Sequence, residues 1–193
     1  MKYKFYFGDL AAIQKRTEWN KDTAEIKKYV KALLKDNALE AKIKEYKVLN
    51  LNDPDKQLTL DFSISMVWPD AAGSTVYLNT CMMKFFETNP FTSPVRKYPM
   101  QFPAKESQTY TFNLKLPNGY TIDDVPKSSV IKIDDNNQYK NMIAYNKDDN
   151  TLSVYSRLQM PRIFYEEGDY SILKEFFQKM GDAQQANVVI KKQ

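Results

Sequence analysis

The chain has 193 residues, of which 42% are hydrophobic and 13% aromatic, and its formal net charge is +4. This length suits one good core, or one core with a small appendage, and the composition excludes a disordered or low-complexity protein. Thirteen Tyr and eleven Phe against five Gly favour a sheet-rich fold, because aromatic side chains suit half-buried pleated surfaces. Lysines are interspersed with acidic residues along the sequence, so we expect a solvated surface and no nucleic-acid binding face.

The absence of histidine excludes several catalytic chemistries. Cys–His and Ser–His nucleophile systems need an imidazole to take a proton, and zinc sites mostly need histidine or several cysteines. The chain has no histidine and a single cysteine, Cys81, so no disulfide can form within it. The sequence therefore predicts neither an enzyme nor a metal or cofactor site. It also contains no apolar run of the ~20 residues that a membrane helix needs.

The first 37 residues are expected to be mostly helical. Alternating aromatics predict a strand over 2–7, and apolar residues at helical spacing predict helices over 9–19 and 23–36. We interpret residues 1–37 as a helical preface, a remnant of or linker from a preceding domain, and residues 38–193 as the main domain. A chain that begins inside a strand also suggests a piece of a larger protein.

Period-two patterns dominate the rest of the chain. Apolar residues alternate over 58–68 and 110–116, which predicts strands with one buried and one solvated face. Further strands are expected over 39–49, 76–86, 130–133, 139–146, 151–160 and 188–190. Because helices do not alternate with these strands, the sequence predicts a mainly β fold. We expect an antiparallel, immunoglobulin-like β-sandwich with a short helical N-terminal preface and one late helix.

The late part of the chain allows more specific predictions. If Asn146 pairs with Thr151 in a hairpin, Met142 lies opposite Tyr155 on its outer side, and every other pair is chemically sensible. A helix is expected to begin at Gly168 and Asp169, with Gly181 at the C′ position beyond its end. The prolines over 90–103 predict an irregular or edge segment, since proline cannot donate a hydrogen bond within a central strand. Its aromatic residues are expected to reach the core; they are Phe91, Tyr98 and Phe102.

The acidic doublets and the single cysteine are expected to be structural. Each doublet falls at an expected turn or element end, where Asp stabilises the local backbone, and none has the D-x-[DN]-x-[DN]-G calcium pattern. Cys81 lies beside methionines, with no imidazole to activate it, so we expect a small core residue. We therefore name no catalytic residue.

Aromatic side chains give the best argument for binding, because an aromatic face stacks on sugar rings and tyrosine loses little entropy. Most aromatics on strands are core residues or cross-strand partners. Tyr155 differs, since its strand parity places it on the outer side. We take Tyr155, Met142, Tyr98 and Tyr120 as a candidate surface for peptide or glycan.

A series of motifs carries a family resemblance. In chain order they are Asn89-Pro90-Phe91, Arg96, Tyr98-Pro99, Phe102-Pro103, Leu116-Pro117, Gly119-Tyr120 and Val125-Pro126. Together with the late helix and the ending Val188-Val189-Ile190-Lys191, they resemble the C-terminal β-rich domain of unknown function that follows the transglutaminase-like core in large secreted bacterial proteins.

This resemblance implies a non-catalytic accessory domain, periplasmic or at the cell surface. The domain would support the preceding transglutaminase-like core of the same polypeptide, or an interaction with protein or substrate. The family's Cys, His and Asp triad has no counterpart here, because the chain lacks histidine. The alternative is a stand-alone module that binds glycan or peptide through an aromatic face.

Overall fold

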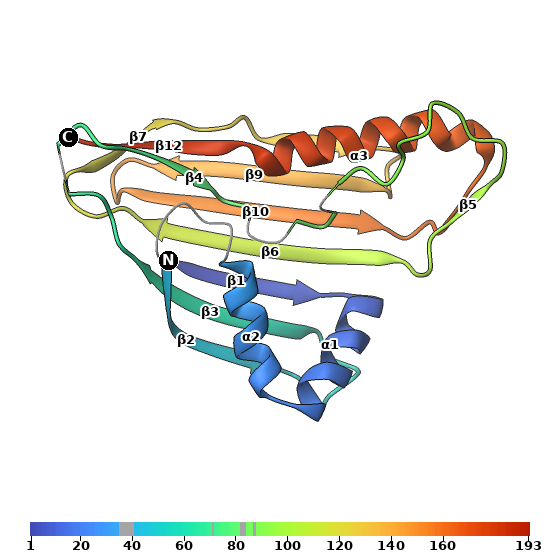
Figure 1. The fold of residues 1–193 in the computed structure, drawn as a ribbon, viewed down its shortest axis with the longest axis horizontal. Helices are drawn as coiled ribbons and strands as arrows, with labels where there is room; N and C mark the ends of the chain where they lie inside the picture. Colours follow the sequence, from blue (N-terminus) through green and yellow to red (C-terminus); the bar gives the residue numbers. More distant parts are fainter. Residues whose placement is uncertain (35–40, 71, 82–83, 87) are drawn as a thin grey trace.

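The computed structural model of the chain describes residues 1–34, 41–70, 72–81, 84–86 and 88–193. The described residues form a mainly β fold with three α-helices (Figure 1). The helical elements are α1 (Asp9–Lys21), α2 (Ala24–Leu33), the 3-10 helix η1 (Glu167–Asp169) and α3 (Tyr170–Gln185). The strands are β1 (Lys2–Phe7), β2 (Ala41–Leu49), β3 (Leu58–Met66), β4 (Thr75–Asn79), β5 (Met100–Gln101), β6 (Glu106–Lys115), β7 (Tyr120–Asp124), β8 (Ser129–Lys132), β9 (Gln138–Asn146), β10 (Thr151–Met160), β11 (Phe164–Tyr165) and β12 (Asn187–Lys192).

The largest sheet has seven antiparallel strands in the order β2-β3-β1-β6-β10-β9-β8. A three-stranded sheet has the order β4-β12-β7, and β11 pairs with β5. The first strand of the chain, β1, lies between β3 and β6 and pairs with both. Residues 1–37, the expected helical preface, therefore contribute an inner strand to the seven-stranded sheet, whose other strands all come from later residues. The proposed division at residues 37 and 38 stays a prediction.

Alternation along the strands buries one face of the seven-stranded sheet. Tyr3, Phe5 and Phe7 of β1 point to this face and are nearly inaccessible. They form a core cluster with apolar residues of β3, β6 and β10, with α1 and α2, and with the three-stranded sheet. Trp19 of α1 fixes the helix on the sheet, because its ring meets the ring of Phe7 edge-on at 5.6 Å.

A second cluster lies under α3. Its helical stripe includes Leu173, Phe177 and Met180, which pack with Leu158 and Met160 of β10. β10 thus carries both clusters, since Leu152 and Val154 nearer its start belong to the first. Phe91 and Phe102 from the proline-rich segment also pack on Phe177.

The expected fold class is confirmed at the level of a mainly β, antiparallel protein. The immunoglobulin-like sandwich is not confirmed. One layer is the seven-stranded sheet, but three helices and the three-stranded sheet share the opposing layer (Figure 1). Neither main sheet is closed.

The hairpin register is confirmed in full: Asn146 pairs with Thr151, and Met142 pairs with Tyr155. The expected end of the late helix is wrong, because α3 continues through Gly181 to Gln185. Its buried stripe extends as far as Gln184, so packing continues beyond the glycine.

Three other predictions have partial outcomes. The strand expected over 76–86 is shorter, since β4 ends at Asn79. Residues 39–40 of the expected strand 39–49, and 35–36 of the expected helix 23–36, lie outside the described residues, as do 82–83. In the proline-rich segment, Phe91 is buried and Phe102 packs on the core as expected, but Tyr98 is 76% exposed.

Candidate functional site

The side of the seven-stranded sheet opposite the core clusters is the candidate site, and we call it the open face. No described helix or second sheet packs on it, since α1, α2, α3 and the three-stranded sheet all join the clusters on the other side. The residues that alternate with the core residues form this face, and most are Lys, Ser, Thr or Asn. A broad polar sheet surface is thus presented to solvent.

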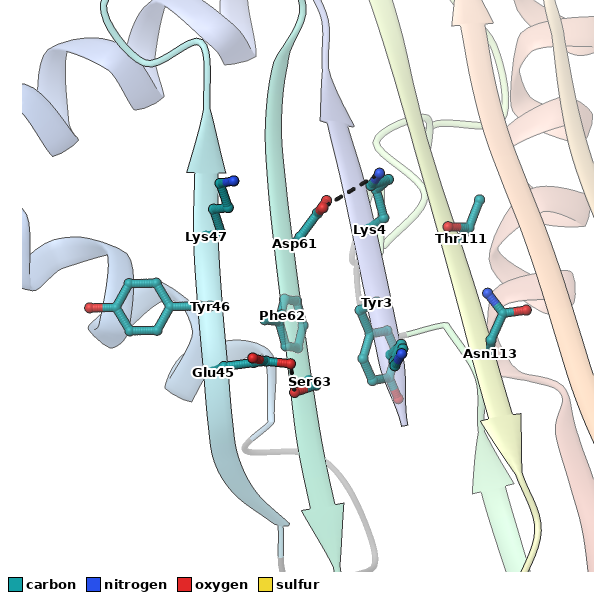
Figure 2. A pocket seen from close by; sticks show the side chains of 11 residues that line it. Tyr3, Lys4, Glu45, Tyr46, Lys47, Asp61, Phe62, Ser63, Thr111 and Asn113 are labelled. Atoms are coloured by element: carbon teal, nitrogen blue, oxygen red, sulfur yellow. Dashed lines mark hydrogen bonds and ion pairs between the residues drawn. The ribbon is translucent and has the colours of Figure 1, made fainter.

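Strand register places six side chains of the open face in one line across six strands, which we call the central row. It runs from β2 to β9 through Lys47, Asp61, Lys4, Thr111, Tyr155 and Met142. Figure 2 shows its first four members following one another across β2, β3, β1 and β6. The row begins with charged groups, continues with a hydroxyl, and ends with an aromatic and a thioether side chain.

A shallow cavity of about 500 Å³ lies over the charged half of the row (Figure 2). It is lined by residues of β1, β2, β3 and β6, among them Lys2, Lys4, Lys47 and Asp61. Both polar and apolar atoms line it. The cavity therefore offers cationic groups and hydroxyls close together.

Short contacts hold several of these polar side chains in place. Lys4 Nζ lies 3.4 Å from Asp61 Oδ2. In the next row of the open face, two residues along each strand, Ser63 donates a hydrogen bond of 3.1 Å to Glu45, and Ser153 donates one of 2.8 Å to Asn113. Asp61 and Glu45 are thus engaged with neighbours on the face.

The structure brings together two of the four residues expected to bind. Tyr155 and Met142 are cross-strand partners on the open face, with 37% and 46% of their surface exposed. Tyr120 is buried instead; its ring contacts Trp68 at 5.1 Å and its hydroxyl donates to the carbonyl of Pro69. Tyr98 lies outside the sheet, in the segment before β5.

Sequence reasoning missed the basic members of the face. Lys2 and Lys4 alternate with the buried Tyr3 and Phe5 on β1, so their shared side could have been derived from parity alone. Lysines interspersed with acidic residues along the chain predict a uniformly solvated surface. Parity gives the side of each lysine on its own strand, but the gathering of these lysines on one face depends on the order of the strands in the sheet.

Cys81 is placed as expected of a core residue. Its side chain is 7% exposed, and burial raises the pKa of its thiol to about 11. At neutral pH the group is therefore a thiol and a poor nucleophile. In the described part of the chain, no group of three or more His, Cys, Asp or Glu is arranged to hold a metal ion.

The acidic doublet at Asp134 illustrates the structural role of these carboxylates. Asp134 Oδ1 accepts hydrogen bonds of 2.8 Å from the backbone N–H groups of Asn136 and Asn137. Burial acts to raise the pKa of Asp134, but these bonds hold it below its ordinary value. The carboxylate therefore closes the turn between β8 and β9.

Comparison with known proteins identifies a family. Residues 74–190, more than half of the chain, match the family described as a domain of unknown function with solved structure, DUF3858. A search of curated proteins gives no match. A crystal structure described as a "putative protease" from Parabacteroides distasonis is similar over 51% of this chain and 19% of its own, with 12% identity and a TM-score of 0.43. Among described residues, no helix has the length and apolar character needed to cross a membrane.

Proposed function

The chain belongs to the DUF3858 family, and we propose that it is a non-catalytic accessory domain of a secreted or periplasmic protein with a transglutaminase-like core. The motifs that resemble the domain after such a core run from Asn89 to Pro126, inside the matched range of 74–190. The domain supports the preceding core or holds protein substrate near it.

The observation that carries the non-catalytic part of the proposal is the burial of Cys81 in a chain without histidine. Acyl transfer by a cysteine needs an accessible thiolate and a base that accepts its proton. Cys81 is buried, its pKa is raised to about 11, and an imidazole is absent from the sequence. The chemistry of such a protein would therefore come from another domain.

Truncation of the parent protein tests the proposal. The parent reading frame is expected to encode a Cys…His…Asp core upstream of this chain. Deleting residues 1–193 is expected to lower the melting temperature of the core, or raise KM for a protein substrate, while kcat for a small substrate is retained. Hydrolase or acyl-transfer activity in the isolated chain would contradict the proposal, as would a parent without such a core.

A second candidate function is a stand-alone module that binds glycan or peptide. The exposed pair Tyr155 and Met142 on the open face favours it, because an aromatic ring beside a polarizable side chain suits stacking and apolar contact. A glycan or peptide array tests it: Tyr155→Ala is expected to abolish a hit. Tyr77→Ala, which removes another exposed tyrosine on β4, is expected to leave it unchanged.

A further inference from the structure

The open face carries more positive charge than the whole chain. Its two carboxylates are Glu45 and Asp61, and its cationic side chains are Lys2, Lys4, Lys42, Lys47, Lys115, Lys132, Lys140 and Arg157. Among the described strand residues, eight cations and two carboxylates give the face a formal charge of +6, against +4 for the whole chain, so all other residues together sum to −2. Strand parity has therefore concentrated cations on the one uncovered side of the sheet.

The two ends of the central row differ in chemistry. Lys47 and Lys4 lie in its first half, whereas Tyr155 and Met142 end it. Adjacent strands lie about 4.8 Å apart, so six strands span roughly 24 Å, which an extended peptide of about seven residues matches. A ligand along the row would meet cations first and apolar surface last.

We propose that the open face binds an acidic polypeptide segment lying along the central row. Its carboxylates contact the lysines around the cavity, and an apolar side chain at its other end covers Tyr155 and Met142. The inference rests on the proposed accessory function, since it names the kind of partner that the domain holds. Charge complementarity provides orientation and speeds association, and the tyrosine and methionine provide apolar contact.

Other occupants fit this face less well. A second copy of the chain packed face to face would oppose two surfaces of +6, which is repulsive. Nucleic acid presents a continuous line of phosphates, and Asp61 and Glu45 stand within the cationic half of the face. A peptide avoids this conflict, because its backbone N–H groups can donate to carboxylates between contacts with lysine.

The test uses a labelled seven-residue peptide of four glutamates, a serine and two leucines, titrated with the full chain and followed by fluorescence anisotropy. Two control peptides replace the glutamates by glutamine or the leucines by serine, and both are expected to bind more weakly. Raising the salt concentration is expected to weaken binding, because screening acts on exposed charges.

Matched charge variants locate the site. The combined change Lys2→Glu, Lys47→Glu and Lys140→Glu is expected to weaken binding about tenfold or more, since three cationic side chains of the open face are reversed in charge. The combined change Lys21→Glu, Lys84→Glu and Lys97→Glu alters net charge equally but lies outside the open face, and is expected to have little effect. Tyr155→Ala is expected to weaken the leucine peptide more than the serine peptide.

Three results would overturn the inference: no binding of the acidic peptide, equal loss in both charge variants, or tighter binding of heparin or single-stranded DNA with the same dependence on Lys2, Lys47 and Lys140. Circular dichroism of each variant identifies any that fails to fold, and Tyr155→Ala then provides the independent measurement. If the peptide does not bind but truncation of the parent still impairs its core, the accessory function stands and only the surface is wrong.

Discussion

Lys4 and Asp61 form an ion pair in the charged half of the central row, with 3.4 Å between Nζ and Oδ2. They are cross-strand partners on β1 and β3, and Lys47 flanks Asp61 on its other side. One carboxylate thus lies between two lysines in the row. This arrangement keeps the cations spaced along the sheet and leaves Lys47 available to a ligand.

The pair itself is expected to contribute little to stability. Both side chains are partly exposed, at 40% and 35%, and such pairs contribute about 0–1 kcal/mol. A double-mutant cycle with Lys4→Met and Asp61→Asn, measured by urea unfolding, is therefore expected to give a coupling energy below about 1 kcal/mol. A larger coupling would mean that the row is part of the stabilising framework rather than a surface available for binding.

Two glycines are expected to respond to alanine with opposite signs. A Cβ on Gly8 would lie 2.0 Å from the backbone oxygen of Ser107, so the start of α1 or β6 would have to shift. A Cβ on Gly181, inside α3, would meet nothing within 4 Å. Gly8→Ala is expected to lower the free energy of unfolding by about 1–3 kcal/mol, and Gly181→Ala to raise it by roughly 0.5–1 kcal/mol.

Chemical denaturation of both variants at one pH provides the measurement. The sign for Gly8 depends on the close approach of β1 and β6, and that for Gly181 on helix α3 continuing past residue 181. If Gly181→Ala instead lowered the free energy of unfolding, the result would support the prediction from sequence that the helix ends at Gly181.

Much of the sheet could be predicted from sequence because period-two alternation is a local signal. The register of β9 and β10 was derived correctly, since a short turn and pair chemistry both limit it. Long-range pairing could not be derived in the same way. The position of β1 between β3 and β6 depends on partners more than 50 residues away, as in the pairing of Phe5 with Leu60 and Tyr110.

The candidate site was predicted only in part for the same reason. The outward parity of Tyr155 and Met142 follows from the hairpin alone. The buried position of Tyr120 follows from its packing on Trp68, across more than 50 residues of sequence. The basic row required the order of six strands, which no local pattern contains.

Glu106 is expected to make stability depend on pH. Burial, followed by the charge of Asp9, raises the pKa of this carboxyl above its ordinary value, although a hydrogen bond from Gln108 opposes the shift. The folded chain therefore holds a proton that the unfolded chain releases at lower pH. Stability from this group is present below the unfolded pKa of about 4.3 and is lost as pH rises through the higher folded pKa.

The variant Glu106→Gln removes the charge that burial disfavours. Its free energy of unfolding is expected to exceed that of the unmodified chain at pH 7 and to lose this advantage at pH 4 and below. Urea unfolding at both values measures the difference. Glu175→Gln, on the exposed surface of α3, is the control and is expected to show no comparable pH-dependent gain.

Cys81 is expected to be chemically inert while the chain is folded. With a pKa of about 11, roughly one thiol in a thousand is ionised at pH 8, whereas about a quarter would be ionised at the ordinary pKa of about 8.5. Burial to 7% exposure also limits access of a reagent to the sulfur. Iodoacetamide at pH 8 should therefore label the native chain at least a hundredfold more slowly than the chain in guanidinium, as measured by mass spectrometry over time. If the two rates were equal, Cys81 would be an accessible thiolate, and the proposal of a non-catalytic domain would lose the observation on which it rests.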